Sequence, residues 1–234
     1  MTDGVQESPN VFLVDVDETL IDDRRIQSDL RKFIEHACGV DCRDRFLALL
    51  ESLHQSLGYC DYLGALQRYR IEYPRDSGVL AVSSFLLDYP FADRLFPHAL
   101  EFLEYLQTWG RAVVVSDGDA VFQPRKIERS GIRAAVESRV IVCVHKEDAT
   151  ADIEQQYPAR HYILVDHSTR ALQTLRRGLS GPVSTVLVGH GDSHKERTAF
   201  ASYSTPDVTV KHIGDLLNYD FSLLLAPREV EAVR

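Results

Sequence analysis

The chain has 234 residues, 44% hydrophobic and 26% charged, as in a soluble globular protein of one domain or of a domain with a sizeable insertion. Its net charge of −9 argues against broad electrostatic attraction to nucleic acid or to an anionic membrane. No apolar run is long enough to cross a membrane, and the polar N-terminus MTDGVQESPN lacks the pattern of a secretory signal. We therefore expect a cytoplasmic protein.

The four cysteines fit a reducing compartment. Cys38 and Cys42 have a CxxxC spacing that could ligate zinc, but no second pair and no suitably spaced histidine follows nearby. We expect these two residues, together with Cys60 and Cys143, to be free thiols.

The first predicted strand ends in a pair of carboxylates. Val11 to Val14 is a continuous apolar run, typical of a strand buried on both faces of a parallel sheet, and Asp15 and Asp17 follow it. Buried carboxylates are costly unless a cation or hydrogen-bond donors meet them. Taken alone, this stretch predicts either a metal-binding or functional pocket or an acidic turn after a strand.

The next stretch, residues 23–89, predicts only helices. Apolar residues recur at intervals of three and four, as at Leu30, Phe33, Ile34 and Ala37, and no convincing strand interrupts the pattern. This period is that of helices with one apolar face.

We interpret this block as an insertion. The expected architecture is an α/β core of residues 1–21 and 93–234, with an all-helical cap domain of residues 22–92 inserted after the first strand. Tyrosines and arginines of the cap predict either contact with an anionic or ring-bearing substrate or packing of helix on helix. They are Tyr59, Tyr62, Arg68, Tyr69, Arg70, Tyr73 and Arg75.

Beyond the cap, strands and helices alternate. Further apolar strands are predicted at residues 112–115, 140–144, 162–165 and 184–188, with a short strand at 208–210. Such alternation predicts a doubly wound parallel sheet with right-handed crossovers, in which ligands bind at the carboxyl ends of the strands. Those ends carry Asp15, Asp17, Ser116, Lys146 and Asp166.

These strand ends resemble the four motifs of the haloacid dehalogenase superfamily, most of whose members are magnesium-dependent phosphatases. The matching stretches are DVDETL from Asp15, VVVSDGD from Val113, VCVHKEDA around Lys146 and ILVDHS from Ile163. Order and spacing agree across residues 15–168. The resemblance implies a Rossmann-like core and a hydrolase active site at this edge of the sheet.

The resemblance also implies roles for the two carboxylates of the first motif. Asp15 would be the nucleophile that takes the phosphoryl group as an aspartyl phosphate, a kind of intermediate that carboxylates can form. Asp17 would protonate the leaving alcohol and then activate water.

The phosphate site is expected from the second and third motifs. Ser116 would hydrogen-bond a phosphoryl oxygen, with the amides of Asp117 and Gly118 beside it, and Lys146 would offset the charge of phosphate and nucleophile. Lys126, in the helix after Ser116, is a competing lysine. We expect it to lie a few turns into that helix and to point away.

The resemblance implies magnesium, with manganese as an alternative, bound by Asp15, Asp17 (through its backbone carbonyl) and Asp166. Here the sequence departs from the family, whose fourth motif usually offers two acidic residues. This chain has His167 next to Asp166, and Arg170 four residues on. Because imidazole is a poor magnesium ligand, His167 either shifts the preferred ion toward a transition metal or lies outside the ligand set. We expect the second arrangement.

A further group of possible ligands follows the strand at 184–188. It comprises His190, Asp192 and His194. We expect a solvated histidine-rich loop here, with the ligand group as the alternative.

The expected function is hydrolysis of a small phosphorylated metabolite, a phosphomonoester, by a metal-dependent enzyme that acts without nucleic acid or membrane, as a monomer or homodimer. One alternative is a catalytically weak protein that binds a phosphorylated ligand as a regulator. A less favoured alternative is a 2-haloacid dehalogenase, which would need neither Asp17 nor a metal.

Overall fold

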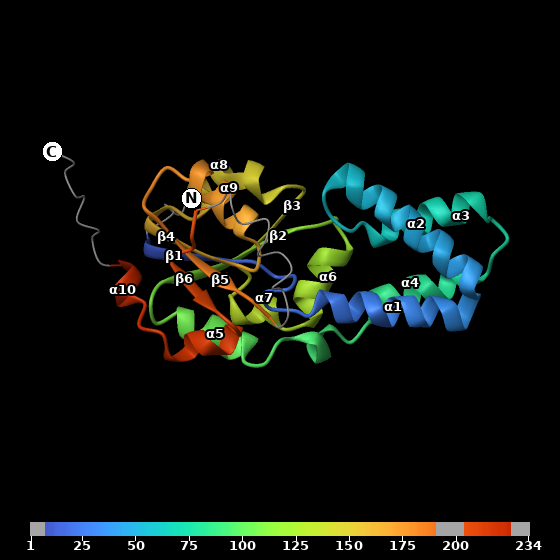
Figure 1. Cartoon of the computed structure of the whole chain (residues 1–234), viewed down its shortest axis with the longest axis horizontal. Helices are drawn as coiled ribbons and strands as arrows, with labels where there is room; N and C mark the ends of the chain where they lie inside the picture. Colours follow the sequence, from blue (N-terminus) through green and yellow to red (C-terminus); the bar gives the residue numbers. More distant parts are fainter. Residues whose placement is uncertain (1–7, 191–203, 226–234) are drawn as a thin grey trace, which may run out of the picture.

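The computed structural model describes residues 8–190 and 204–225, which form a parallel sheet covered by helices, with further helices to one side (Figure 1). All neighbouring strands pair in parallel, in the order β3-β2-β1-β4-β5-β6. This is the strand order of doubly wound sheets and confirms the predicted α/β class. The strands are β1 (Ser8–Val14), β2 (Arg111–Asp117), β3 (Val140–Cys143), β4 (Ala159–Asp166), β5 (Val183–Val188) and β6 (Val208–Val210).

Two helical layers cover the sheet because its central strands are apolar on both faces. In β1, Val11 and Leu13 pack toward α8 and α9, while Phe12 and Val14 face the opposite layer. The helices of the core are η1 (Phe91–Arg94), α5 (Ala99–Leu106), α6 (Phe122–Arg129), α7 (Ile132–Ala135), η2 (Lys146–Ala149), α8 (Thr150–Gln156), α9 (Thr169–Gly178), η4 (Ile213–Asn218) and α10 (Ser222–Leu225).

The segment between β1 and η1 forms helices, as predicted, and we call residues 22–92 the helical insertion. Asp22 caps the first helix by accepting the Arg25 N–H at 2.9 Å, and Gly58 ends the second in the left-handed region, at φ 82°. The helices are α1 (Asp23–Cys38), α2 (Val40–Leu57), α3 (Tyr62–Glu72) and α4 (Gly78–Asp88). They lie to the right of the sheet in Figure 1. That they form a separate cap domain stays a prediction.

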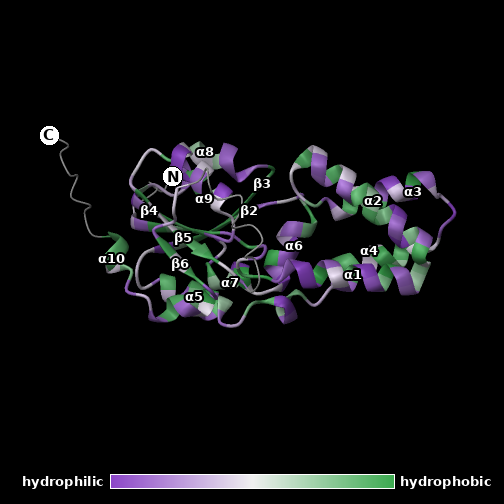
Figure 2. Ribbon diagram, in the orientation of Figure 1, coloured by the Kyte–Doolittle hydropathy of each residue, from purple (hydrophilic) through white to green (hydrophobic). Residues whose placement is uncertain are grey.

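The insertion joins the core through two adjacent connections. Ile21 and Leu95 form an antiparallel bridge, and the Asp22 N–H donates to the Arg94 carbonyl at 2.8 Å. The two parts also share hydrophobic contacts. One apolar cluster contains residues of α1–α4 and the residues of the sheet face on which Phe12 and Val14 lie. Figure 2 shows the hydrophobic strands at the centre and alternating hydrophobic and hydrophilic stretches along α1–α4. The start and end of the insertion are therefore fixed side by side.

Tyrosines singled out in the insertion pack within the protein. Tyr62 and Tyr69 are buried, and the Tyr69 ring stacks on that of Tyr73 with 4.8 Å between centroids. The side chains of Arg68 and Arg70 are exposed. These tyrosines follow the helix-packing alternative.

Two expectations from composition concern membranes and cysteines. Within residues 8–190 and 204–225, no helix combines the length and the apolar character needed to cross a membrane. All four cysteines are free thiols, as expected.

The turn before α10 supplies an apolar side chain that packs against the sheet face on which Phe12 lies. Phe221 is fully buried, and its ring lies 5.1 Å from that of Phe12 and 5.9 Å from that of Trp109. We expect Phe221→Ala to lower the free energy of unfolding by about 3–5 kcal/mol, because it leaves a cavity. The matched control Leu223→Ala, at a side chain 70% exposed, should change it by about 0.5 kcal/mol or less.

Urea unfolding followed by fluorescence measures both variants, since the chain's single tryptophan lies beside the cavity. Equal losses in the two variants would contradict this account of Phe221.

Candidate active site

The chain leaves regular strand geometry just after Asp15. The Asp15 N–H still pairs with the Val165 carbonyl at 3.0 Å, one residue beyond β1. The chain then folds tightly, and Glu18 takes the left-handed region at φ 56°. The Val16 carbonyl accepts from several amides at once, those of Thr19, Leu20 and Ile21, at 3.3, 2.8 and 3.0 Å.

The Lys146 ammonium joins the ends of β1 and β4. Its Nζ donates to Asp15 Oδ1 at 2.9 Å and to Asp166 Oδ2 at 2.6 Å, and all three side chains are buried. Lys146 begins η2, with two residues between it and the end of β3, and its backbone N–H donates to Asp117 Oδ1 at 2.6 Å. The structure thus brings together three strand-end residues that the sequence places up to 151 positions apart, Asp15 being the first and Asp166 the last.

The charges in this cluster shift one another's pKa. Burial raises the pKa of Asp15, but the Lys146 ammonium and the hydrogen bond from His167 outweigh it, so this pKa lies well below its usual range. Burial and the nearby Asp15 raise the pKa of Asp166. Burial lowers the pKa of Lys146, but the two carboxylates raise it well above its ordinary value. Asp15 is therefore a carboxylate and Lys146 an ammonium at neutral pH.

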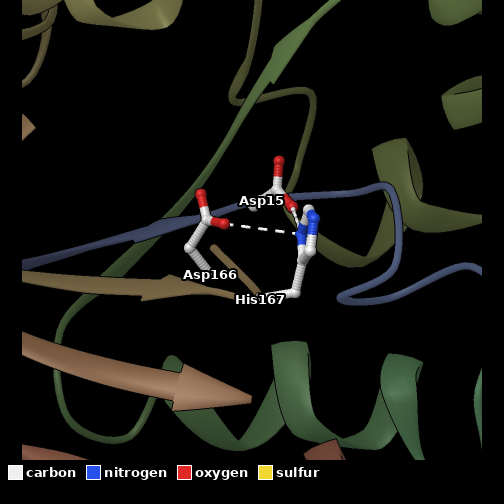
Figure 3. Close-up of side chains that lie close together, drawn as sticks. All are labelled: Asp15, Asp166 and His167. Carbon is white, nitrogen blue, oxygen red and sulfur yellow. Dashed lines mark hydrogen bonds and ion pairs between the residues drawn. The ribbon is translucent and has the colours of Figure 1, made fainter. Parts of the chain in front are cut away.

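His167 faces both carboxylates (Figure 3). Its Nδ1 lies 3.1 Å from Asp15 Oδ2 and 3.4 Å from Asp166 Oδ1. Burial lowers the pKa of the ring, but the hydrogen bond to Asp15 and the two negative charges raise it to about 9. The Thr19 hydroxyl donates to the same Asp15 Oδ2 at 2.7 Å and accepts the His167 N–H at 3.1 Å.

The donor set fits a divalent cation. One ligand atom each from Asp15, Asp166 and His167 lies within 4.8 Å of the others. Carboxylate oxygens suit magnesium, while an imidazole nitrogen suits manganese and other transition metals better. His167 thus lies within the possible ligand group, which differs from the expected arrangement in which it lies outside.

Asp17 lies in a second ion-pair network, and here the expectation for Lys126 is wrong. Lys126 does not point away, because its Nζ donates to Asp17 Oδ1 at 2.7 Å and to Asp23 Oδ1 at 2.8 Å. The reason is that α6 begins only at Phe122, which places Lys126 about one turn into the helix. Burial raises the pKa of Asp17 to about 6, although the Lys126 charge opposes the shift.

The end of β2 agrees only in part with the expected phosphate site. Ser116 is buried, and its Oγ accepts a hydrogen bond from Gln123 Nε2 at 2.7 Å. The Gly118 amide, expected to be available for phosphate, donates instead to the Cys143 carbonyl at 3.0 Å. Glycine is needed here because a Cβ at Gly118 would lie 2.6 Å from the Cβ of Gln123.

The loop after β5 also approaches the site. The His190 Nε2 lies 2.9 Å from the Thr19 carbonyl oxygen, and its ring stacks on Phe96 with 3.5 Å between centroids. Asp192 and His194 lie outside the described residues. A pocket of about 990 Å³ is lined by His190, Glu18 and the start of α1, and its lining includes neither Lys146 nor the carboxylates that Lys146 pairs with.

Comparison with known proteins agrees with the motifs. The search of family models and the search of curated proteins found no match. Among solved structures, a haloacid dehalogenase-like hydrolase from Burkholderia xenovorans LB400 is 44% identical, with a TM-score of 0.85 over 91% of this chain and 99% of that one. The chain therefore belongs to the haloacid dehalogenase-like hydrolases.

More distant structures share the fold. The magnesium-bound HAD-hydrolase YfnB from Bacillus subtilis is 12% identical, with a TM-score of 0.61 over 94% of this chain and 99% of that one. The L-2-haloacid dehalogenase from Xanthobacter autotrophicus is 17% identical, with a TM-score of 0.57 over 88% of this chain and 96% of that one. The fold thus occurs in a magnesium-bound hydrolase and in a dehalogenase.

The pairing of Lys146 with two buried carboxylates predicts a loss of stability when the ammonium is removed. Without added divalent cation, Lys146→Met should lower the free energy of unfolding by about 3–5 kcal/mol, because Asp15 and Asp166 lose their shared partner. Lys211→Met, at an exposed side chain, is the control, and its free energy of unfolding should equal that of the wild type. Urea titration at neutral pH measures both.

Manganese or magnesium should recover part of the loss, since a cation that binds only the folded state stabilises it. A Lys146→Met variant as stable as the wild type would contradict the pairing.

Proposed function

We propose that this protein is a metal-dependent phosphohydrolase, which hydrolyses a small phosphomonoester through an aspartyl phosphate on Asp15. The observation that carries the proposal is the contrast between two carboxylates two residues apart. Asp15 has a lowered pKa beside Lys146 and His167, whereas the pKa of Asp17 is raised to about 6. A charged carboxylate suits a nucleophile, and one that titrates near neutrality suits a general acid and base.

In the first step an Asp15 carboxylate oxygen would attack phosphorus, and the bond from phosphorus to the ester oxygen would break. Asp17 would give its proton to that oxygen, so that the alcohol leaves neutral. In the second step Asp17 would take a proton from water as the water oxygen attacks phosphorus. The bond to Asp15 would then break, which releases phosphate and restores both carboxyl groups.

Other residues would stabilise the charge that the phosphoryl group carries. Lys146 already touches Asp15 and would offset the combined charge of nucleophile and phosphate, while Ser116 would donate its hydroxyl hydrogen to a phosphoryl oxygen. A divalent cation held by Asp15, Asp166 and His167, magnesium or manganese, would add positive charge at the same oxygens. The helical insertion would exclude water and select the substrate.

A second candidate is a catalytically weak protein that binds a phosphorylated ligand. The His167 ring favours this candidate, because its Nδ1 lies close to both carboxylates and the pKa of the ring is raised to about 9. A protonated ring there would compete with a metal ion. Ligand binding without turnover at any metal concentration is the signature of this candidate.

A panel of phosphomonoesters with magnesium or manganese tests the proposed function. We expect phosphate release by the wild type, and a fall of at least about 10³-fold in kcat for Asp15→Asn, because the amide cannot act as the nucleophile. Asp44→Asn is the control, since that carboxylate is exposed on α2 and should leave the rate unchanged.

Each alternative has its own outcome. Equal rates for Asp15→Asn and the wild type would contradict the aspartyl phosphate. Chloride release from 2-chloropropionate without metal, in the absence of phosphatase activity, would identify a dehalogenase instead.

A further inference from the structure

Lys126 is a buried cation that the steps above do not use. Its side chain is 1% exposed, and it lies in the second turn of α6. A lysine is rarely buried this completely unless it is paired. Its Nζ has two partners from different parts of the chain, Asp17 in the loop after β1 and Asp23 in the first turn of α1.

Helix α6 holds both oxygens of the Asp17 carboxylate. Gln123 and Lys126 are three positions apart, so they lie on the same face of the helix. Lys126 Nζ donates to Oδ1 at 2.7 Å, and Gln123 Nε2 approaches Oδ2 at 3.2 Å while also donating to Ser116 Oγ. With both oxygens engaged, the Asp17 side chain is restricted in its rotation. One helix face thereby orients two proposed site residues, Asp17 and Ser116.

The second partner of Lys126 connects this arrangement to the helical insertion. Besides pairing with Lys126, Asp23 accepts a hydrogen bond from Gln27 Nε2 at 2.9 Å and one from the Tyr62 hydroxyl at 3.3 Å. Tyr62 belongs to α3, and its ring lies 4.8 Å from that of Phe122 in α6. A continuous set of buried contacts therefore runs from α3 and α1 to Asp17.

We propose that Lys126 is a positioning residue, which fixes the Asp17 carboxylate for proton transfer and ties it through Asp23 to the start of the helical insertion. The proposal rests on the phosphohydrolase function proposed above. A general acid must lie within hydrogen-bond reach of the leaving oxygen, and its contribution is typically about 10²–10⁴-fold in rate. Lys126 touches no reacting atom and acts through Asp17.

The dependence on the leaving group separates this role from a structural one. An alkoxide leaves poorly unless it is protonated, whereas p-nitrophenolate is a weak base that leaves without a proton. Misplacement of Asp17 therefore slows cleavage of an alkyl phosphate much more than cleavage of p-nitrophenyl phosphate. Damage to the whole site slows both to the same degree.

The test uses the double variant Lys126→Met/Asp23→Asn. Lys126→Met alone would leave two carboxylates without their cation and could fail to fold. In the double variant position 23 carries no charge. Asp17, whose side chain is 33% exposed, keeps the hydrogen bond from Gln123. We expect its urea midpoint to stay near that of the wild type.

Release of the leaving group is measured in a single turnover with p-nitrophenyl phosphate and with the alkyl phosphate that the wild type hydrolyses fastest. We expect the rate constant of the double variant to fall about 100-fold with the alkyl phosphate and less than about 10-fold with p-nitrophenyl phosphate. KM, taken from steady-state rates, should change little. Arg129→Met is the matched control. It removes another α6 cation that pairs with the insertion, at Asp88, but at the exposed surface, and both rates should stay unchanged.

Equal losses with the two substrates, or no loss in a folded double variant, would overturn the role of Lys126. A wild-type protein that hydrolyses neither kind of phosphoester would overturn the proposed function itself, and with it the inference built on that function.

Discussion

The ion pairs of Lys146 with Asp15 and Asp166 are the interaction on which the site depends. The sheet places β1 and β4 side by side, so their terminal carboxylates meet in a buried position. Two such anions repel each other and lose hydration, and only a cation within hydrogen-bond distance of both makes the arrangement stable. Lys146 provides it from the third strand end, at 2.9 and 2.6 Å. The same contacts that stabilise the folded chain also keep Asp15 charged.

A second lysine makes the two carboxylates of the first motif chemically different. Asp15 is enclosed with Lys146 and His167, while Asp17 shares Lys126 with another carboxylate, Asp23. Burial and the negative charge of Asp23 raise the pKa of Asp17, whereas at Asp15 the two cations outweigh burial and lower the pKa. Two side chains separated by one residue can thus take the opposite protonation states that the proposed mechanism requires.

The sequence predicted what depends on local pattern. Apolar runs ending in Asp15, Ser116, Lys146 and Asp166 identify parallel strands and the edge where their ends meet. The role of Lys126 depends instead on where α6 begins and how it is rotated, and its partner Asp23 lies 103 positions away in the chain. Likewise, the Gly118 amide pairs with Cys143 because β3 extends alongside it, which the local sequence does not specify.

The position of the Lys126–Asp23 pair matters because it adjoins the two connections of the insertion. Ile21 pairs with Leu95, so the chain enters and leaves the insertion at one point. When a rigid group of helices rotates about such a point, displacement grows with distance from it. Asp23, two residues beyond Ile21, then moves little, whereas the turn between α3 and α4 moves most. Under the proposed function, a closure of this kind over a substrate would leave the Lys126–Asp23 pair intact and Asp17 in place.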